Sequence, residues 1–431
     1  STAFPDSATM GRMKGAFLGS CLLILAAETF LRFLDGRHQH RHRGRVPPGF
    51  ETAVSAATVE QAGDYARARK NVTLIESVTG ETLFLLFLFT PLLPGYDRWA
   101  APLSGSPICG GVLFFLGLFL LARLFDAPFS WYRTFRLEDR FGFNRASPGL
   151  WISDQVKSMA LTMVLIVPLA AGSLWLVTAT NRWWLWVWGL WMAVSLFLMV
   201  ISPYVIEPLF FKFQPLPDGE LAQSVNHLMK EAGLRAGKVL QVDASRRSSH
   251  SNAYFTGIGK EKRIVLFDTL LEQMNRQEVV AVLAHEIGHW RSRHVRQRLL
   301  FSAAVSAAGF YVAYGLVSFG DIPAWVGAGE LSLAAQLLVL SAAARIAGFF
   351  ATPLSAAWSR HHEREADDFA IRLTNQPRAL ASALIKLARE NLANLYPHPL
   401  YAWFYYTHPP LVERVTRLQN LPSATPEEAQ V

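Results

Sequence analysis

The sequence predicts a mainly α-helical integral membrane protein, with seven transmembrane helices joined to a polar domain that contains a small β-sheet. Hydrophobic residues make up 51% of its 431 residues. They are grouped in long apolar runs rather than spread with the periodicity of a soluble fold. Two polar segments interrupt this pattern: 207–299 lies between the fifth and sixth runs, and 358–431 follows the seventh.

Seven apolar runs are long enough, or nearly so, to cross the roughly 30 Å hydrocarbon core of a bilayer, which takes about 20 helical residues. They are 15–34, 82–96, 107–125, 158–180, 183–206, 300–320 and 331–355. The second is short and contains Pro91 and Pro94, which predicts a kink or an extension by polar turns on its flanks. Five tryptophans between residues 182 and 191 predict an aromatic belt at a membrane surface.

These runs divide the chain into four parts. Residues 1–206 hold the first five helices with their connecting loops, and 207–299 form the first part of the polar domain. Residues 300–357 hold the sixth and seventh helices, and 358–431 complete the polar domain. The two polar segments are therefore expected to fold together, although two membrane spans separate them in sequence.

Lys and Arg are distributed unevenly. With the N-terminus outside, 34 of the 41 fall in the inner stretches and four in the outer ones. Because cytoplasmic loops carry such an excess, we expect the polar domain and the C-terminus to be cytoplasmic. The basic balance is then explained by topology and the lipid bilayer, and nucleic acid is excluded as a partner. Arg345, deep in the last run, indicates an internal polar space.

The first polar segment predicts strands followed by a helix. Strand-like stretches at 238–244 and 262–268 flank "HSNAYFTG" at 250–257. The sequence "NRQE" at 275–278 predicts a helix start, because Asn275 is a good N-cap and Glu278 follows three residues later. This helix carries the stretch "VLAHEIGHWRSRHV" at 282–295.

His285 and His289 lie four residues apart in that stretch, so both imidazoles point to one side of the helix. Two neutral imidazoles suit zinc, and Glu286 between them can act as general base toward a water that the metal activates. The upstream residues are apolar, so the motif lies on a buried helix where unpaired polar groups would be costly. His294 is interpreted as a surface histidine.

A catalytic zinc needs a third protein ligand. In "SRHHEREADDFA" at 359–370, Glu363 and Asp367 are four residues apart and share one helix face. We expect Glu363 to bind the metal and Asp367 to accept the N–H of a ligating histidine. His361 and His362 are rival ligands, and a solvated acidic face is the alternative for the charge run.

A peptide hydrolase must also hold its substrate and stabilise an oxyanion. The stretch at 250–255 can present a strand edge to an extended peptide, with Asn252 pairing to its backbone. His408 and Arg414, in "THPPLVER", can donate to the developing charge. On composition alone, a plain strand–turn and a proline-terminated loop serve equally well for these two stretches.

Together these residues resemble the M48 family of membrane zinc metallopeptidases, and most closely its Ste24 branch, the CAAX prenyl proteases. The resemblance rests on "HSNAYFTGIGKEKRIVLFDTLL", "LAHEIGHW", "SRHHEREADDFA" and "THPPLVER", which occur in family order. The segments 128–154 and 207–221 also resemble the family. The likeness therefore covers nearly the whole chain, with the seven apolar runs completing it.

The resemblance implies a seven-helix α-barrel that encloses a water-filled chamber, with one zinc ion per chain facing its interior. It matches His285, His289 and Glu363 to the zinc ligands and Glu286 to the base. It also matches three groups of residues beyond these: Asn252 to a contact with the substrate backbone, His408 and Arg414 to transition-state groups, and Asp367 to the acid behind a ligand.

The implied activity is hydrolysis of peptide bonds near the C-terminus of substrate proteins, with or without a prenyl group. The alternative is a membrane-protein quality-control protease that needs no prenyl group. We expect a monomeric enzyme. Its composition, rich in arginine and poor in lysine, favours a bacterial inner membrane, and the endoplasmic reticulum membrane is the expectation for a eukaryotic source.

Overall fold

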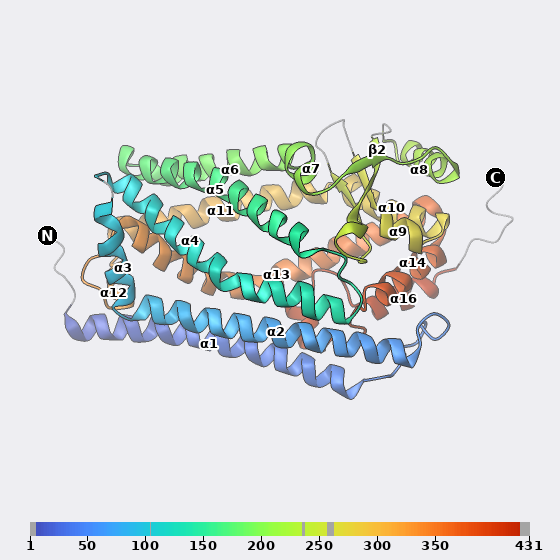
Figure 1. Cartoon of the computed structure of the whole chain (residues 1–431), viewed down its shortest axis with the longest axis horizontal. Helices are drawn as coiled ribbons and strands as arrows, with labels where there is room; N and C mark the ends of the chain where they lie inside the picture. Colours follow the sequence, from blue (N-terminus) through green and yellow to red (C-terminus); the bar gives the residue numbers. More distant parts are fainter. Residues whose placement is uncertain (1–5, 104, 235–237, 257–262, 423–431) are drawn as a thin grey trace.

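Long helices run side by side along most of the molecule (Figure 1). This computed structural model describes residues 6–103, 105–234, 238–256 and 263–422. The small sheet and most of the shorter helices gather at one end of the long helices, on the right in Figure 1, and α1, the first helix, starts at the opposite end. We call the first of these the sheet end.

Seven helices within the described residues are long and apolar enough to cross a membrane, which confirms the predicted number. They are α1 (Ser7–Arg41), α2 (Ala56–Phe89), α4 (Pro107–Tyr132), α5 (Pro148–Ala179), α6 (Trp183–Ile201), α11 (His294–Phe319) and α13 (Leu333–Thr374). Turns of π-helix extend two of them: η2 (Arg133–Glu138) continues α4, and η3 (Ser202–Ile206) leads from α6 into α7 (Glu207–Phe210).

Several of these helices are longer than a bilayer requires. Helices α1 and α2 have 35 and 34 residues, and α13 has 42. At a rise of 1.5 Å per residue, these lengths are about 50 to 63 Å, against roughly 30 Å of hydrocarbon. The excess lets α1, α2 and α13 continue into the sheet end, where they contribute directly to the polar domain (Figure 1).

The second predicted span, 82–96, has the wrong bounds, but the predicted break at its prolines and its extension by polar turns are both confirmed. Helix α2 begins 26 residues earlier, at Ala56, and stops at Phe89. Thr90 is extended, with φ −118° and ψ 175°, because the ring of Pro91 disfavours a helical conformation in the residue before it. A separate helix, α3 (Leu92–Ala100), follows and ends in the short turn η1 (Ala101–Leu103).

Few residues of the spans are buried against protein. In the most apolar 18-residue windows, the buried share is 28% for α13 and at most 11% for the other six. Helices of a solid bundle would bury a continuous stripe on at least one side. Between these loosely packed helices, Nη1 of Arg345 donates to Oε2 of Glu81 on α2 at 2.7 Å, and the Arg345 side chain is 49% exposed.

The tryptophan cluster at the start of α6 is divided between two environments. Trp188 donates to the carbonyl oxygen of Ala303 on α11 at 3.2 Å, and Trp183 is buried. Trp186 and Trp191 are 58% and 46% exposed. Part of the cluster therefore joins α6 to α11, and part points outward as an interfacial belt requires.

The sheet has four short strands in the order β1-β2-β4-β3. They are β1 (Phe213–Pro215), β2 (Lys238–Val242), β3 (Ala253–Thr256) and β4 (Arg263–Phe267). β2 and β4 are parallel, and the two outer strands pair antiparallel to them. The predicted strands at 238–244 and 262–268 correspond to β2 and β4, apart from Lys262, which lies outside the described residues. β3, from the "HSNAYFTG" stretch, is an edge strand.

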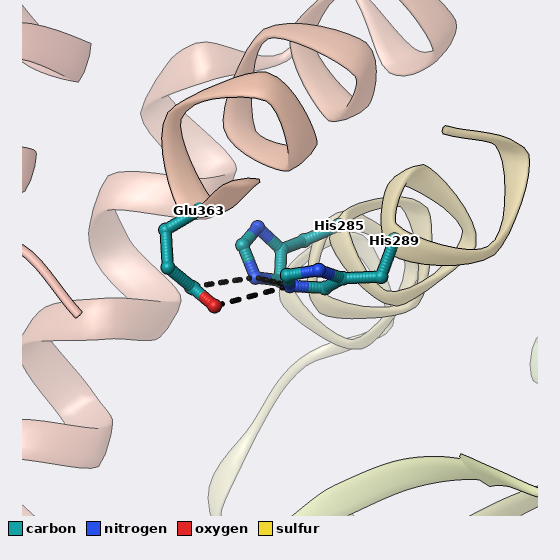
Figure 2. A group of neighbouring side chains, drawn as sticks. All are labelled: His285, His289 and Glu363. Carbon is teal, nitrogen blue, oxygen red and sulfur yellow. Dashed lines mark hydrogen bonds and ion pairs between the residues drawn. The ribbon is translucent and has the colours of Figure 1, made fainter. Parts of the chain in front are cut away.

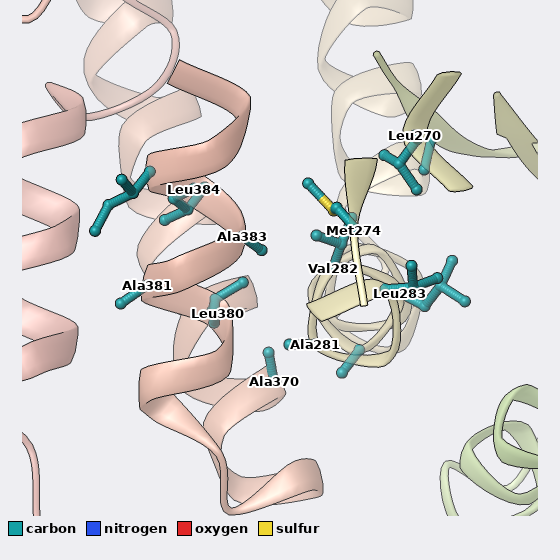
Figure 3. Packing of buried hydrophobic residues seen from close by; sticks show 14 of the residues in the cluster. Leu270, Met274, Ala281, Val282, Leu283, Ala370, Leu380, Ala381, Ala383 and Leu384 are labelled. Carbon is teal, nitrogen blue, oxygen red and sulfur yellow. The ribbon is translucent and has the colours of Figure 1, made fainter. Parts of the chain in front are cut away.

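Shorter helices surround α10 (Arg276–Arg291), whose residues from Val279 to Ala284 are buried on nearly every side. Figure 3 shows α10 packed against side chains of α13 and α14 and of the segment before it. The remaining short helices are α8 (Glu220–Glu231), η4 (Ala244–Arg246), α9 (Asp268–Gln273), α12 (Ile322–Val326), α14 (Pro377–Glu390), α15 (Pro399–Tyr405) and α16 (Leu411–Gln419).

The predicted capping box fixes the beginning of α10. The side chain of Asn275 accepts from the backbone N–H of Glu278 at 3.0 Å, and Oε2 of Glu278 accepts from the N–H of Asn275 at 2.8 Å. Glu278 also accepts from Ser382 and Lys386 of α14, both at 2.7 Å. Burial alone would raise the pKa of Glu278, but these donors outweigh it and hold the pKa below its ordinary value.

We expect Glu278→Gln to lower the free energy of unfolding at pH 7 by about 1–3 kcal/mol, since a hydrogen-bonded charge beside Lys386 is lost. Because the folded pKa is lowered, this stability is present above the unfolded pKa of about 4.3 and is lost as the pH falls through the folded value. Thermal unfolding of both proteins in detergent at pH 7 and at pH 3–4 measures the difference. A gap independent of pH would contradict the role of the charge.

Candidate metal site

Helix α10 carries three of the predicted site residues, and its surroundings fix their direction. His285 is buried, His289 is partly buried and Glu286 lies between them, half-buried. The apolar core around α10 holds the helix in one rotation, so the two imidazoles face α13 (Figure 2). Glu363, 3% exposed, projects toward them from α13.

A glycine brings these two helices together. A Cβ atom at Gly288 would lie 2.9 Å from both Cα and the carbonyl oxygen of Ala366 on α13, and 3.2 Å from Cβ of Phe369. Only a residue without a side chain fits this approach without displacing backbone. Gly288 lies between Glu286 and His289, so the close crossing occurs at the height of the site.

We therefore expect Gly288→Ala to separate α10 from α13. Overpacking of this kind typically costs about 1–3 kcal/mol, and it would move the imidazoles away from the carboxylate of Glu363. The free energy of unfolding and the affinity for added zinc should both fall. Gly63→Ala, on a helical glycine of α2 with open space where its Cβ would lie, is the matched control and should be neutral or mildly stabilising. Unchanged metal affinity in Gly288→Ala would contradict this account.

Three side chains converge where the two helices meet. Nε2 of His285 lies 3.4 Å from Oε2 of Glu363, and Nε2 of His289 lies 3.2 Å from Oε1. The two Nε2 atoms are 3.3 Å apart. Oε2 of Glu363 is buried and accepts no hydrogen bond from the described residues. A buried carboxylate that faces two imidazole nitrogens and has one oxygen without a donor fits a cation among the three groups.

Asp367 lies behind the first histidine. Its Oδ1 is 2.8 Å from Nδ1 of His285, on the ring side opposite the Nε2 atom that faces Glu363. Arg414 of α16 clamps the same carboxylate, with Nε 3.0 Å from Oδ2 and Nη2 2.6 Å from Oδ1. Both Asp367 and Arg414 are buried, so this bidentate pair is shielded from solvent. The arginine thereby holds the carboxylate that in turn holds His285.

A cavity of about 400 Å³ opens onto the three groups. Its wall includes Glu286, His408, and Phe255 and Thr256 of β3. Nε2 of His408 lies 3.3 Å from Oε1 of Glu363, and its side chain is 61% exposed. Burial raises the pKa of Glu286, and the neighbouring imidazoles oppose this rise. The cavity thus places the carboxylate of Glu286 and the imidazole of His408 around one space, beside His285, His289 and Glu363.

Asn252 stands at the start of β3 and its side chain is exposed. Its Oδ1 accepts from the N–H of Ala253 at 2.9 Å, and its carbonyl oxygen accepts from the N–H of Phe267 on β4 at 3.1 Å. The same strand reaches the cavity through Phe255 and Thr256. β3 therefore connects the predicted substrate contact with the wall of the site.

The surface position predicted for His294 is wrong: this side chain is 1% exposed. After α10 ends, Arg293 adopts a left-handed conformation with φ 59°, which changes the direction of the chain, and α11 starts at His294. Nδ1 of His294 then lies 3.0 Å from Nδ1 of His289. Spacing gave no signal for this contact, because a five-residue separation would not place the two rings together on one continuous helix.

Seven membrane helices and a largely buried His–His–Glu group beside the carboxylate of Glu286 define a membrane-embedded metallopeptidase. A family model of the CAAX prenyl protease N-terminal region with five membrane helices matches residues 36–212, and a model of peptidase family M48 matches residues 215–421. The chain belongs to the M48 peptidase family, in its CAAX prenyl protease 1 group.

Individual proteins support this membership. The chain is 33% identical to CAAX prenyl protease 1 of Saccharomyces cerevisiae, over 91% of this chain and 93% of the relative. It is 37% identical to the CAAX prenyl protease 1 homolog of Arabidopsis thaliana, over 87% and 90%. The crystal structure of Ste24p from S. mikatae superimposes with a TM-score of 0.86 at 30% identity, covering 94% of this chain and 98% of that one.

Proposed function

We propose that His285, His289 and Glu363 bind one zinc ion and that the chain uses it to hydrolyse peptide bonds. The observation that carries this proposal is the spacing of the three groups: the two Nε2 atoms are 3.3 Å apart, and they lie 3.4 and 3.2 Å from Oε2 and Oε1 of Glu363, respectively. Two ligands bound tetrahedrally at about 2.1 Å from zinc are separated by about 3.4 Å. Three protein ligands leave the fourth position open, which is the arrangement of catalytic rather than structural zinc.

The chemistry follows from where the side chains lie. When bound, zinc would supply a water of lowered pKa and a polarised substrate carbonyl. Glu286 takes the proton of the attacking water and passes it to the nitrogen of the leaving amine as the C–N bond breaks. His408 donates to the developing oxyanion. Arg414 contributes a second donor to the oxyanion through Nη1, which lies 3.9 Å from Oε2 of Glu363. Its Nε and Nη2 atoms bind Asp367.

The substrate peptide is proposed to lie along β3. An edge strand offers unpaired backbone groups to an extended chain, which pairs as one more strand. In this arrangement Asn252 contacts the peptide backbone at the start of the strand, and Phe255 and Thr256 lead it to the catalytic cavity. Backbone pairing accepts many sequences, so side-chain specificity would come from the rest of the cavity.

A water-filled chamber between the spans would supply the second reactant. Two observations support it: the low burial of the seven spans, and the exposed Arg345 that pairs with Glu81 within them. An ion pair at this depth is expensive against lipid and is found where water or protein surrounds it. We infer that the helices form the wall of an α-barrel rather than a solid bundle.

We propose that the sheet end faces the cytoplasm, because the basic stretches on that side contain most of the Lys and Arg residues. The arginine-rich composition favours a bacterial inner membrane. We also propose that the enzyme acts as a monomer, since all groups of the site come from one chain. The two sequence segments 207–299 and 358–431 together form its peptidase domain.

We propose cleavage near the C-terminus of substrate proteins, following the relatives named CAAX prenyl protease 1. The test is cleavage of one peptide, with and without a prenyl group, by the purified zinc-loaded protein in lipid vesicles. Faster cleavage of the prenylated peptide supports this specificity, and equal rates favour the quality-control role instead. Cleavage of neither, with zinc bound, contradicts the peptidase assignment. Glu286→Gln, prepared identically, controls for contaminating proteases.

A further inference from the structure

We propose that His294, supported by Glu365, positions the ligand His289 and fixes the proton of its ring on Nδ1. His294 is a positioning residue in this account, because it acts on the metal through His289. The inference rests on the proposed function only in taking His289 as a zinc ligand. It gives His289 a histidine as its partner, whereas the partner of His285 is the carboxylate of the Asp367–Arg414 pair.

The geometry forms a continuous chain of three side chains. Nδ1 of His289 is 3.0 Å from Nδ1 of His294, and Nε2 of His294 is 2.9 Å from Oε2 of Glu365. The left-handed turn at Arg293 allows the first contact by interrupting the helix between α10 and α11. Glu365 lies on α13, two residues beyond the ligand Glu363. The three side chains therefore link α10, α11 and α13 at the site.

The positions of the protons follow from these contacts. A histidine that binds a metal through Nε2 carries its proton on Nδ1 when neutral. Two facing Nδ1 atoms form a hydrogen bond only if one of them carries a proton, so His289 donates and His294 accepts. His294 then carries its proton on Nε2 and donates it to Glu365. Each ring nitrogen in the chain has one role, and the tautomer of both histidines is determined.

Packing holds His294 in this orientation. Its ring stacks on that of His362, with centroids 3.9 Å apart and planes 9° from parallel. Trp358 packs in turn against His362. Nε2 of His362 lies 3.0 Å from Oε1 of Gln297. The stacked ring of His362 thus fixes the orientation of His294. A residue that orients a metal ligand must itself be held in place by packing.

The same residues do not form a second metal site. Donor atoms of His294, His362 and Glu365 lie within 4.8 Å of one another, which by distance alone would allow an ion. However, parallel stacked rings direct their in-plane lone pairs past each other rather than toward a shared point. Both nitrogens of His294 are also committed to His289 and Glu365. The cluster therefore serves the ligand that it contacts.

The decisive comparison is between His294→Leu and His294→Asn. Leucine removes the acceptor, while the Oδ1 atom of asparagine can occupy the place of Nδ1 and accept from His289. We expect the zinc affinity of His294→Leu, measured by competition with a chelator, to fall about 10–100-fold, the usual cost of losing a partner behind a ligand. His294→Asn should recover most of this loss. Both measurements are made on the full-length protein in detergent, independently of activity.

Two further variants separate positioning from folding. Glu365→Ala, at a side chain that is 44% exposed, should weaken zinc binding in the same direction without disturbing the core. His361→Ala is the matched control: it is a neighbouring histidine that also contacts Glu365, at 3.5 Å, but its side chain is 66% exposed. We expect its zinc affinity to equal that of the unmodified protein.

The outcomes distinguish this inference from the proposed function. If His289→Ala loses zinc while His294→Leu and Glu365→Ala retain full affinity, the positioning role is overturned and the ligand set stands. If His289→Ala retains zinc with full affinity, the ligand set and the positioning role both fall. Equal losses in His294→Leu and His294→Asn, with Glu365→Ala unaffected, would assign His294 to packing alone and overturn the inference.

Discussion

Glu286→Gln should bind zinc with normal stoichiometry and lose nearly all turnover. Glutamine has the size of glutamate but cannot take a proton from water, and general base catalysis commonly contributes about 10²–10⁴ in rate. The loss should appear in kcat and kcat/KM alike, because the carboxylate acts on the reacting water rather than on substrate binding. Zinc content by metal analysis and initial rates on one peptide measure the two properties in the same preparation.

Glu413→Gln is a suitable control for this variant. Glu413 pairs with Arg364 at 3.0 Å on the same side of the molecule, and its side chain is 53% exposed. Its replacement should change neither zinc content nor rate. Normal cleavage by Glu286→Gln would reject the proposed base, and loss of zinc together with activity would assign Glu286 to metal binding instead.

Glu363→Ala should lose zinc. Removing one of the three proposed ligands leaves only the two imidazoles of α10. Loss of a residue that supports a ligand usually lowers metal affinity about 10–100-fold. The zinc affinity of Glu363→Ala should fall by more than this. The substitution also removes the carboxylate opposite the two Nε2 atoms, 3.2 and 3.4 Å away. Chelator competition measures the affinity, and unfolding in the presence of the chelator shows whether the metal-free fold is intact.

Asp367→Asn tests whether the effect of Glu363→Ala is specific to ligation. Asp367 lies one turn beyond Glu363 on α13 and is also buried. Its substitution alters the partner of His285 without removing a ligand. We expect it to weaken zinc binding clearly less than Glu363→Ala does. Full zinc occupancy of Glu363→Ala would reject Glu363 as a ligand.

Some features of this fold were predictable because they depend on local patterns. Apolar runs of fixed length predict spans, and the four-residue spacing of His285 and His289 predicts one helix face. The capping box at Asn275 and Glu278 is equally local, and the structure contains it. Each of these conclusions requires only residues that lie within a few turns of one another.

Other features depend on contacts that spacing does not contain. The burial of His294 requires the left-handed turn at Arg293 and the approach of His362 from α13, and two membrane spans separate these two histidines in the sequence. The clamp of Arg414 on Asp367 joins residues 47 positions apart. The length of α13 was also unforeseen, because the apolar run ends well before the helix does. In each case, tertiary packing decided the outcome.

The continuity of α13 has a consequence for biosynthesis. The two histidines of α10 are translated first, followed by α11, which crosses the membrane, and then by α13, which returns across it with Glu363 on the same helix. The three proposed ligands can therefore meet only after both of these helices have been made. A nascent chain that ends before α13 has the two histidines but lacks Glu363, so the proposed site is completed late in synthesis.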